Sequence, residues 1–169
     1  MNVPPTGRIE SGDRLVLTRT LHAPLSGAWA AVTDPGRLAR WYGPWTGDPS
    51  SGHVEVQLTA EDGAPREVLL IRRCDPPRHL AVTLGPGPGA WRVDLDLHDE
   101  DGAVTLRLSH RDPDPADLEA VGPGWEYYLD RLVAAETGGD PDAVDFARDY
   151  HPALAGHYRG LSQQIRRPG

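Results

Sequence analysis

Residues 23–44, APLSGAWAAVTDPGRLARWYGP, decide the fold of this chain. They follow a strand-like segment and contain two short amphipathic stretches that are separated at Asp34-Pro35. Asp34 can cap the second stretch as a helix, with Pro35 at its first position, where a missing N–H costs little. Each stretch carries a tryptophan, Trp29 in the first and Trp41 in the second. The run therefore predicts two short helices directly after a first strand.

Alternating apolar residues predict strands on both sides of this run. Before it, Leu15, Leu17 and Leu21 share one phase. After it, alternating or densely apolar segments recur between residues 52 and 111. The clearest is WRVDLDL at residues 91–97, where apolar and charged side chains alternate, as in a strand with one buried and one wet face. The pattern predicts an antiparallel meander.

A helix is predicted after these strands, at residues 124–136, GWEYYLDRLVAAE. Its apolar residues recur at helical spacing and form one stripe, with charged residues outside it. The members of the stripe are Trp125, Tyr128, Leu129, Leu132 and Val133. Because a one-sided sheet must cover its apolar face, this helix is the expected cover, and the fold class is α+β.

Composition limits the classes of function. A length of 169 residues suits one main domain. The net charge of −8 argues against a nucleic-acid footprint, which needs a clustered basic face, and against an anionic membrane surface. Cys74 is the only cysteine and lysine is absent, which excludes an intrachain disulfide and a lysine Schiff base. With no signal peptide and no long hydrophobic span, we expect a cytoplasmic protein.

Three sequence elements together resemble the SRPBCC, or START-like, superfamily, and within it the branch named for the activator of heat-shock-protein ATPase. The first is the run at residues 23–44. The second is the pair Pro76-Pro77 followed by Arg78-His79-Leu80, which ends a strand. The third is GWEYYLDRL at residues 124–132, similar to the family's Gly-Trp and Leu signature. The resemblance spans roughly residues 14–136.

The resemblance implies the helix-grip fold, in which a curved antiparallel sheet wraps a long C-terminal helix and leaves a cavity between them. Members bind lipids, hormones or polyketides, and some catalyse cyclisation or hydration. They share no invariant catalytic motif, so no active site can be carried over. The eukaryotic namesake stimulates a chaperone with the help of a further N-terminal domain, for which we expect no room in this chain.

We expect three regions in the chain. Residues 1–12 read as a flexible lead-in, residues 13–137 as the START-like domain, and residues 138–169 as a helical extension packed on or beside it. The extension carries a second apolar stripe, formed by Leu154, Tyr158, Leu161 and Ile165. This stripe either covers the chain's own domain or pairs with a second copy in a homodimer.

Polar residues on the apolar phases are candidates for ligand contact. Arg19 shares the phase of Leu17, and His110 shares the phase of Leu108. A charge that faces an apolar cavity is costly unless it is paired, so an inward Arg19 would suit an anionic ligand group. The alternative is that both residues lie near strand ends and reach solvent at the rim.

Aromatic residues complete the candidate set. Trp41, Tyr42 and Trp45 lie where the second helix exits into a loop, a position that can form a cavity mouth. Core packing explains Trp29 and Trp125 better than ligand stacking does. The candidate ligand-binding residues are Arg19, Trp41, Tyr42, Trp45, Trp91, Leu95, His110, Tyr128 and Leu132.

No catalytic or metal-binding constellation stands out. Ser109 and His110 are adjacent in a strand and would point to opposite faces, and no nucleophile elbow occurs. His151 and His157 would lie on opposite sides of a helix. We therefore expect no metal and no cofactor.

The sequence favours a single-domain protein that binds a small hydrophobic molecule, such as a lipid or polyketide. Two alternatives stay open. The first is an enzyme of the cyclase or hydratase kind, in which His110 or Arg19 polarises a carbonyl. The second is a co-chaperone-like or dimeric interaction protein.

Overall fold

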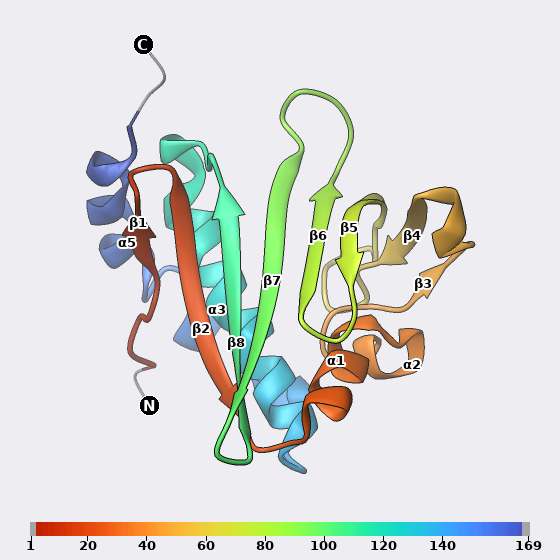
Figure 1. The fold of residues 1–169 in the computed structure, drawn as a ribbon. Coiled ribbons are helices and arrows are strands. Elements are labelled where there is room, and N and C mark those ends of the chain that lie inside the picture. Colours follow the sequence, from red (N-terminus) through yellow and green to blue (C-terminus); the bar gives the residue numbers. More distant parts are fainter. Residues whose placement is uncertain (1–2, 167–169) are drawn as a thin grey trace.

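One antiparallel sheet wrapped around one long helix organises residues 3–166, the part of the chain that this computed structural model describes (Figure 1). The strands are β1 (Arg8–Glu10), β2 (Arg14–Leu21), β3 (Trp45–Thr46), β4 (His53–Gln57), β5 (Arg66–Asp75), β6 (His79–Leu84), β7 (Trp91–Glu100) and β8 (Ala103–Arg111). The α-helices are α1 (Leu25–Thr33), α2 (Pro35–Leu38), α3 (Leu118–Glu136), α4 (Phe146–Asp149) and α5 (Ala155–Leu161). Short 3-10 helices lie at Pro49–Ser51, Pro115–Asp117, Pro141–Ala143 and Ser162–Gln164.

The sheet order is β1-β2-β8-β7-β6-β5-β4-β3, and every neighbouring pair is antiparallel. The long helix α3 crosses behind β2, β8 and β7 in Figure 1. The predicted α+β class, with a curved antiparallel sheet gripping a long helix, two short helices after a strand and a helical C-terminal part, is confirmed.

The predicted alternation sets the buried face of the sheet. Leu17 of β2 lies opposite Leu108 of β8, and Leu21 lies opposite Val104, so the two apolar phases meet on one face. All four side chains are buried, as is Leu129 of α3, which belongs to the same core. The sheet and α3 therefore share one apolar interior.

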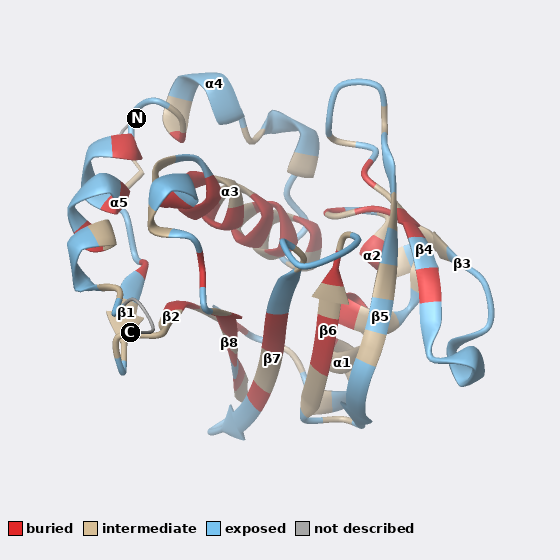
Figure 2. Cartoon of the chain, turned by 90° about the horizontal axis from the view of Figure 1, so that it is seen from above, coloured by how far each residue is buried: buried red, intermediate tan, exposed pale blue. Residues whose placement is uncertain are grey.

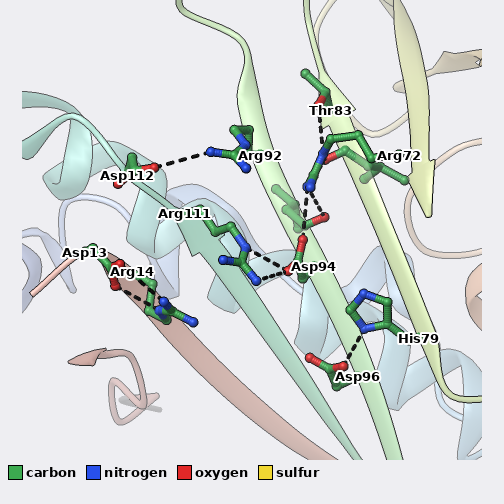
Figure 3. A network of polar contacts seen from close by, with 12 residues as sticks. Asp13, Arg14, Arg72, His79, Thr83, Arg92, Asp94, Asp96, Arg111 and Asp112 are labelled. Atoms are coloured by element: carbon green, nitrogen blue, oxygen red, sulfur yellow. Dashed lines mark hydrogen bonds and ion pairs between the residues drawn. The ribbon is translucent and has the colours of Figure 1, made fainter. Parts of the chain in front are cut away.

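Charged side chains organise the opposite face of the sheet (Figure 3). Asp94 of β7 accepts hydrogen bonds from Arg72 of β5 at 3.0 Å and from Arg111 of β8 at 2.7 Å. On the same face His79 of β6 lies 2.6 Å from Asp96. Burial alone would raise the pKa of Asp94, but the hydrogen bonds and charges of Arg111 and Arg72 hold it below its usual range. This face is stabilised by ion pairs across three strands.

The run at residues 23–44 folds largely as predicted. Asp34 ends α1 and caps α2, where its side chain accepts a hydrogen bond from the Arg37 N–H at 3.0 Å. The second helix stops at Leu38, so Trp41 lies in the turn after it. At Gly43 a Cβ would lie 1.8 Å from the Gln57 carbonyl oxygen. This close approach brings the end of the run against β4.

The C-terminal extension packs on the chain's own α3. The Tyr158 side chain of α5 is fully buried between Gly7 and Gly122, where a Cβ on either glycine would lie within 2.3 Å of one of its atoms. Leu154 and Leu161 of the predicted stripe are also buried. Residues 8–10, within the expected lead-in, form β1 and pair with β2. The extension thus uses most of its apolar stripe within one chain.

Candidate functional site

A cleft of about 960 Å³ lies beside α3, between that helix and the inner face of the sheet. The sheet contributes Leu58 and Glu67 near β4 and β5, and Leu84 at the end of β6. The helix contributes Val121 and Gly124 among others, and residues 142–147 form the third wall. Figure 2 shows this arrangement from above, with the buried α3 between the strands and the segment that leads into α4. The cleft is the space that the helix-grip arrangement leaves unfilled.

Six aromatic side chains belong to the apolar wall of the cleft. Tyr42 and Tyr128 approach to 4.9 Å between ring centroids, and Tyr127 lies 5.3 Å from Phe146. Trp91 and Trp125 meet edge to face at 6.0 Å. All six rings line the cleft, and those of Trp91 and Phe146 are 38% exposed. Large exposed apolar rings in a concave site are typical of a surface that binds an apolar partner.

Carboxylates supply the charge of the cleft. The Tyr128 hydroxyl donates a hydrogen bond to Glu61 Oε1 at 2.8 Å. Glu67 lies on the inner face of β5, opposite the buried Val56 of β4. Burial first, and then the charge of Glu61, raises the pKa of Glu67. Burial also raises the pKa of Tyr42, with a further contribution from the two glutamates. The polar groups of the cleft are therefore acidic carboxyls and phenols.

His110 points inward as its phase predicts, but it does not line this cleft. It lines a neighbouring hollow of about 690 Å³, which shares Trp91, Asp117 and Val121 with the cleft. Its side chain is 2% exposed, and its Nδ1 accepts a hydrogen bond from Trp125 Nε1 at 3.1 Å. Because an indole can only donate, the neutral ring carries its proton on Nε2. Burial lowers the pKa of His110 to about 4.

Arg19 also points inward, where its charge is already paired. Its guanidinium donates to Glu126 at 2.8 Å and to Asp130 at 2.9 Å, both on α3. Burial alone would raise the pKa of Glu126, but hydrogen bonds from Tyr158 and the Thr6 N–H, together with the Arg19 charge, lower it. Arg19 therefore joins β2 to α3 and lies outside the residues that line the cleft.

The remaining candidates divide between the cleft and the core. Tyr42, Trp91 and Tyr128 line the cleft together. Trp41 is buried, and its Nε1 donates to the Ala31 carbonyl at 2.9 Å. Trp45 is half-buried and donates to the Thr33 carbonyl at 2.8 Å. Leu132 is fully buried in the core. Leu95 is partly buried and packs against this core.

Sequence reasoning missed the acidic residues and the third wall. Glu67 lies in the segment EVLLI at residues 67–71, whose apolar residues fall on both phases of a strand. The sequence pattern therefore does not predict that the Glu67 side chain points inward. Residues 142–147 lie in the extension, where Phe146 falls outside the stripe. Only the packing of the extension on α3 brings that ring to the cleft.

Residues 3–166 lack two features, a cluster of metal-binding side chains and a membrane-spanning helix. These residues contain no group of three or more His, Cys, Asp or Glu side chains that could hold a metal ion. Among the same residues, every helix is too short or too polar to cross a membrane.

Comparisons with known proteins agree with this architecture. The sequence profile of the family described as "Activator of Hsp90 ATPase homolog 1-like protein" matches residues 22–136. The comparison with curated proteins finds no match.

Several solved structures share the fold. The solution structure of CalU16 from Micromonospora echinospora is 25% identical, covers 98% of this chain and 100% of its own, and has a TM-score of 0.72. DynU16, described as a protein in the dynemicin biosynthetic locus, is 25% identical over 76% of this chain and 49% of its own, with a TM-score of 0.64. EF2215 from Enterococcus faecalis is 19% identical over 96% of this chain and 92% of its own, with a TM-score of 0.69. The profile match covers more than half of the sequence, and the chain belongs to the AHSA1 family of the SRPBCC superfamily, with the helix-grip fold.

Proposed function

We propose that this protein binds one small, mainly apolar molecule in the cleft between the sheet and α3. The observation that carries the proposal is the cleft itself, about 960 Å³ with six aromatic rings in its wall. Sites for small organic ligands commonly enclose roughly 300–1,000 Å³, with a mostly apolar lining and a few polar groups that fix orientation. The cleft lies at the upper end of that range, which suits a multi-ring or long-chain molecule.

A lipid-like or polyketide-like metabolite fits this proposal. The aromatic rings offer flat faces against which fused rings or chains can pack. DynU16, one of the similar structures, is described as a protein in a biosynthetic locus, which supports a metabolite rather than a macromolecule as the ligand. Burial of apolar ligand surface would supply about 25 cal/mol per Å² in favour of binding, before the costs of association.

The two alternative functions receive less support from the geometry. A cyclase-type site would need polar groups that converge on one point, but Arg19 is paired with two carboxylates of α3 and His110 lines the neighbouring hollow. Dimerisation through the extension would need an exposed stripe, but Leu154, Tyr158 and Leu161 are buried against the chain itself. Binding of a small molecule in the cleft requires neither the release of Arg19 from its carboxylates nor the exposure of the buried stripe.

The proposal is tested by filling the cleft. Ala120 of α3 is exposed and lines the cleft, so Ala120→Trp should occupy part of it without disturbing the core. We expect the wild-type protein to bind N-phenyl-1-naphthylamine, with increased fluorescence of the dye, and the variant to bind it at least about tenfold more weakly, the loss of roughly 1.4 kcal/mol.

The control variant is Ala153→Trp, which adds the same ring at an exposed position outside the cleft and outside the neighbouring hollow. It should bind the dye as the wild type does. Failure of the wild type to bind this dye or any apolar compound in a thermal-shift screen would contradict the proposal, as would equal affinity in the Ala120→Trp variant.

A further inference from the structure

The cleft carries negative charge and no basic side chain. Six of its lining residues are acidic, and none is Arg or His, although the chain contains 17 arginines. The six are Glu61, Asp62, Glu67, Asp117, Asp142 and Asp145. A ligand in this cleft therefore meets aliphatic side chains, aromatic rings and carboxylates, but no basic side chain.

Buried or nearly buried carboxylates elsewhere in the fold are paired with arginines. Asp94, Glu126 and Glu136 are each held by an arginine within 3.0 Å. Among residues 3–166, by contrast, neither Glu61 nor Glu67 forms an ion pair. The half-buried Glu67 and the exposed Glu61 thus lack the arginine partner that these three carboxylates have.

One carboxylate of the cleft, Asp142, does have an arginine beside it. Arg131 lies 3.3 Å from Asp142, but its guanidinium is buried and donates to the carbonyls of Trp41 at 3.0 Å and Pro141 at 2.7 Å. It belongs to the core side of α3 and does not line the cleft. The carboxylates on the sheet side remain without a cation.

Aromatic rings stand beside these unpaired carboxylates. Tyr128 donates its hydroxyl to Glu61, which orients that carboxylate, and Tyr42 packs at 4.9 Å from the Tyr128 ring. Burial, and then the charges of Glu67 and Glu61, raise the pKa of the Tyr42 phenol. Aromatic faces attract cations, and a carboxylate within reach of the same cation adds to that attraction.

We propose that the ligand of this cleft carries a cationic nitrogen, a protonated amine or quaternary ammonium, on an otherwise apolar body. The nitrogen lies near Glu61 and Glu67, against the rings of Tyr42 and Tyr128, and the apolar body lies along Trp91, Trp125 and Phe146. This inference rests on the proposed function, because it assigns the ligand class of the same cleft. It also replaces the expectation from sequence that an inward arginine would select an anionic group.

Three probes with one apolar body and different charges test the inference. They are 2-(2-naphthyl)ethylamine, which is protonated at pH 7, the neutral 2-(2-naphthyl)ethanol, and the anionic 2-naphthylacetate. Each is measured by calorimetry or by displacement of N-phenyl-1-naphthylamine, at low salt and neutral pH. We expect the amine to bind at least about tenfold more tightly than the alcohol, and the carboxylate to bind most weakly. The preference should shrink as salt is raised, because salt screens the attraction.

Variants test whether Glu61 and Glu67 cause the preference for the amine over the alcohol. In the Glu61→Gln/Glu67→Gln double variant the amine should lose its advantage, so that the amine and the alcohol bind alike. Glu55→Gln is the matched control, since Glu55 is exposed on β4, is paired with Arg66 and lies outside the cleft. This control should keep the full preference. If the double variant fails to fold, Glu67→Gln alone should reduce the preference.

The outcomes separate the two proposals. Equal affinity for the three probes would overturn the charge assignment and leave apolar binding intact, as would tighter binding of the carboxylate. Loss of the preference in Glu55→Gln as well would also overturn it, because net charge alone would then explain the effect. Absence of binding by all three probes and by the reporter dye would instead overturn the proposed function.

Discussion

His110 illustrates how one hydrogen bond sets the charge of a buried ring. Trp125 donates to its Nδ1, so a second proton on the ring could only be added by breaking that bond. Burial lowers the pKa of His110 to about 4, compared with 6.5 for the unperturbed group. The ring is therefore neutral near pH 7, with its Nε2–H available as a donor toward the hollow beside the cleft.

A pH dependence of stability follows from this shift. Because the folded pKa lies below the unfolded one, the unfolded chain takes up the proton first as pH falls from 6.5 towards 4, and the free energy of unfolding decreases across that window. His110→Asn keeps an acceptor for Trp125 but cannot titrate. Between pH 7 and pH 5, urea unfolding should show the wild type losing about 2 kcal/mol more than this variant.

The exposed His98 supplies the control for this prediction. His98→Asn should show the same loss between pH 7 and pH 5 as the wild type. Carboxylates with lowered pKa, such as Asp94 and Glu126, contribute to acid sensitivity equally in all three proteins. Parallel stability curves for the wild type and His110→Asn would contradict the assignment of a neutral, buried imidazole.

Among the elements, the contact between α3 and α5 depends on Gly122, which has no side chain at the point where the helices meet. The Tyr158 ring passes so close to Gly122 that a Cβ there would lie 2.1 Å from its Cδ1. The ring cannot easily move away, because its hydroxyl is fixed by Glu126 at 2.5 Å and by the Gly7 N–H at 3.2 Å. Gly122 is therefore a steric requirement of the helix pair.

We expect Gly122→Ala to lower the free energy of unfolding by about 1–3 kcal/mol, the usual effect of overpacking a core. Gly124→Ala, two residues further along the same helix, adds the same methyl group where nothing lies within 4 Å. Since alanine favours helix, this control should be neutral or stabilising by up to about 1 kcal/mol. Chemical denaturation measures both, and equal effects would show that α5 does not pack as described.

The elements differ in how far sequence predicts them. Clean alternation in β7 and β8 predicted both their strands and their buried faces, because one side of the sheet is apolar and the other is charged. In β5 the apolar residues occupy both phases, and Val68 and Leu70 are exposed. Its inner residues, including Glu67, could not be identified without the register with β4. β1 is three residues long and has no pattern of its own.

At the scale of the whole molecule, the cleft is what sequence predicts least. The phases of the strands identify which side chains point inward, as they did for Arg19 and His110. They do not identify which part of the inner face α3 leaves uncovered. That depends on where α3 crosses the sheet and on residues 142–147, which the extension brings to the cleft. Tyr42, Trp91 and Tyr128 were predicted as candidates from their residue type and position.

Entry of an apolar, cationic molecule into the cleft beside α3 can be followed by a titration with two-dimensional amide NMR. With 2-(2-naphthyl)ethylamine as the probe, we expect saturable shifts at residues that line the cleft, such as Val121, Gly124 and Ala143. The amides near Asp94, on the opposite face of the sheet, should not shift. Shifts confined to that opposite face, or the absence of shifts at a concentration where the dye binds, would contradict binding in the cleft.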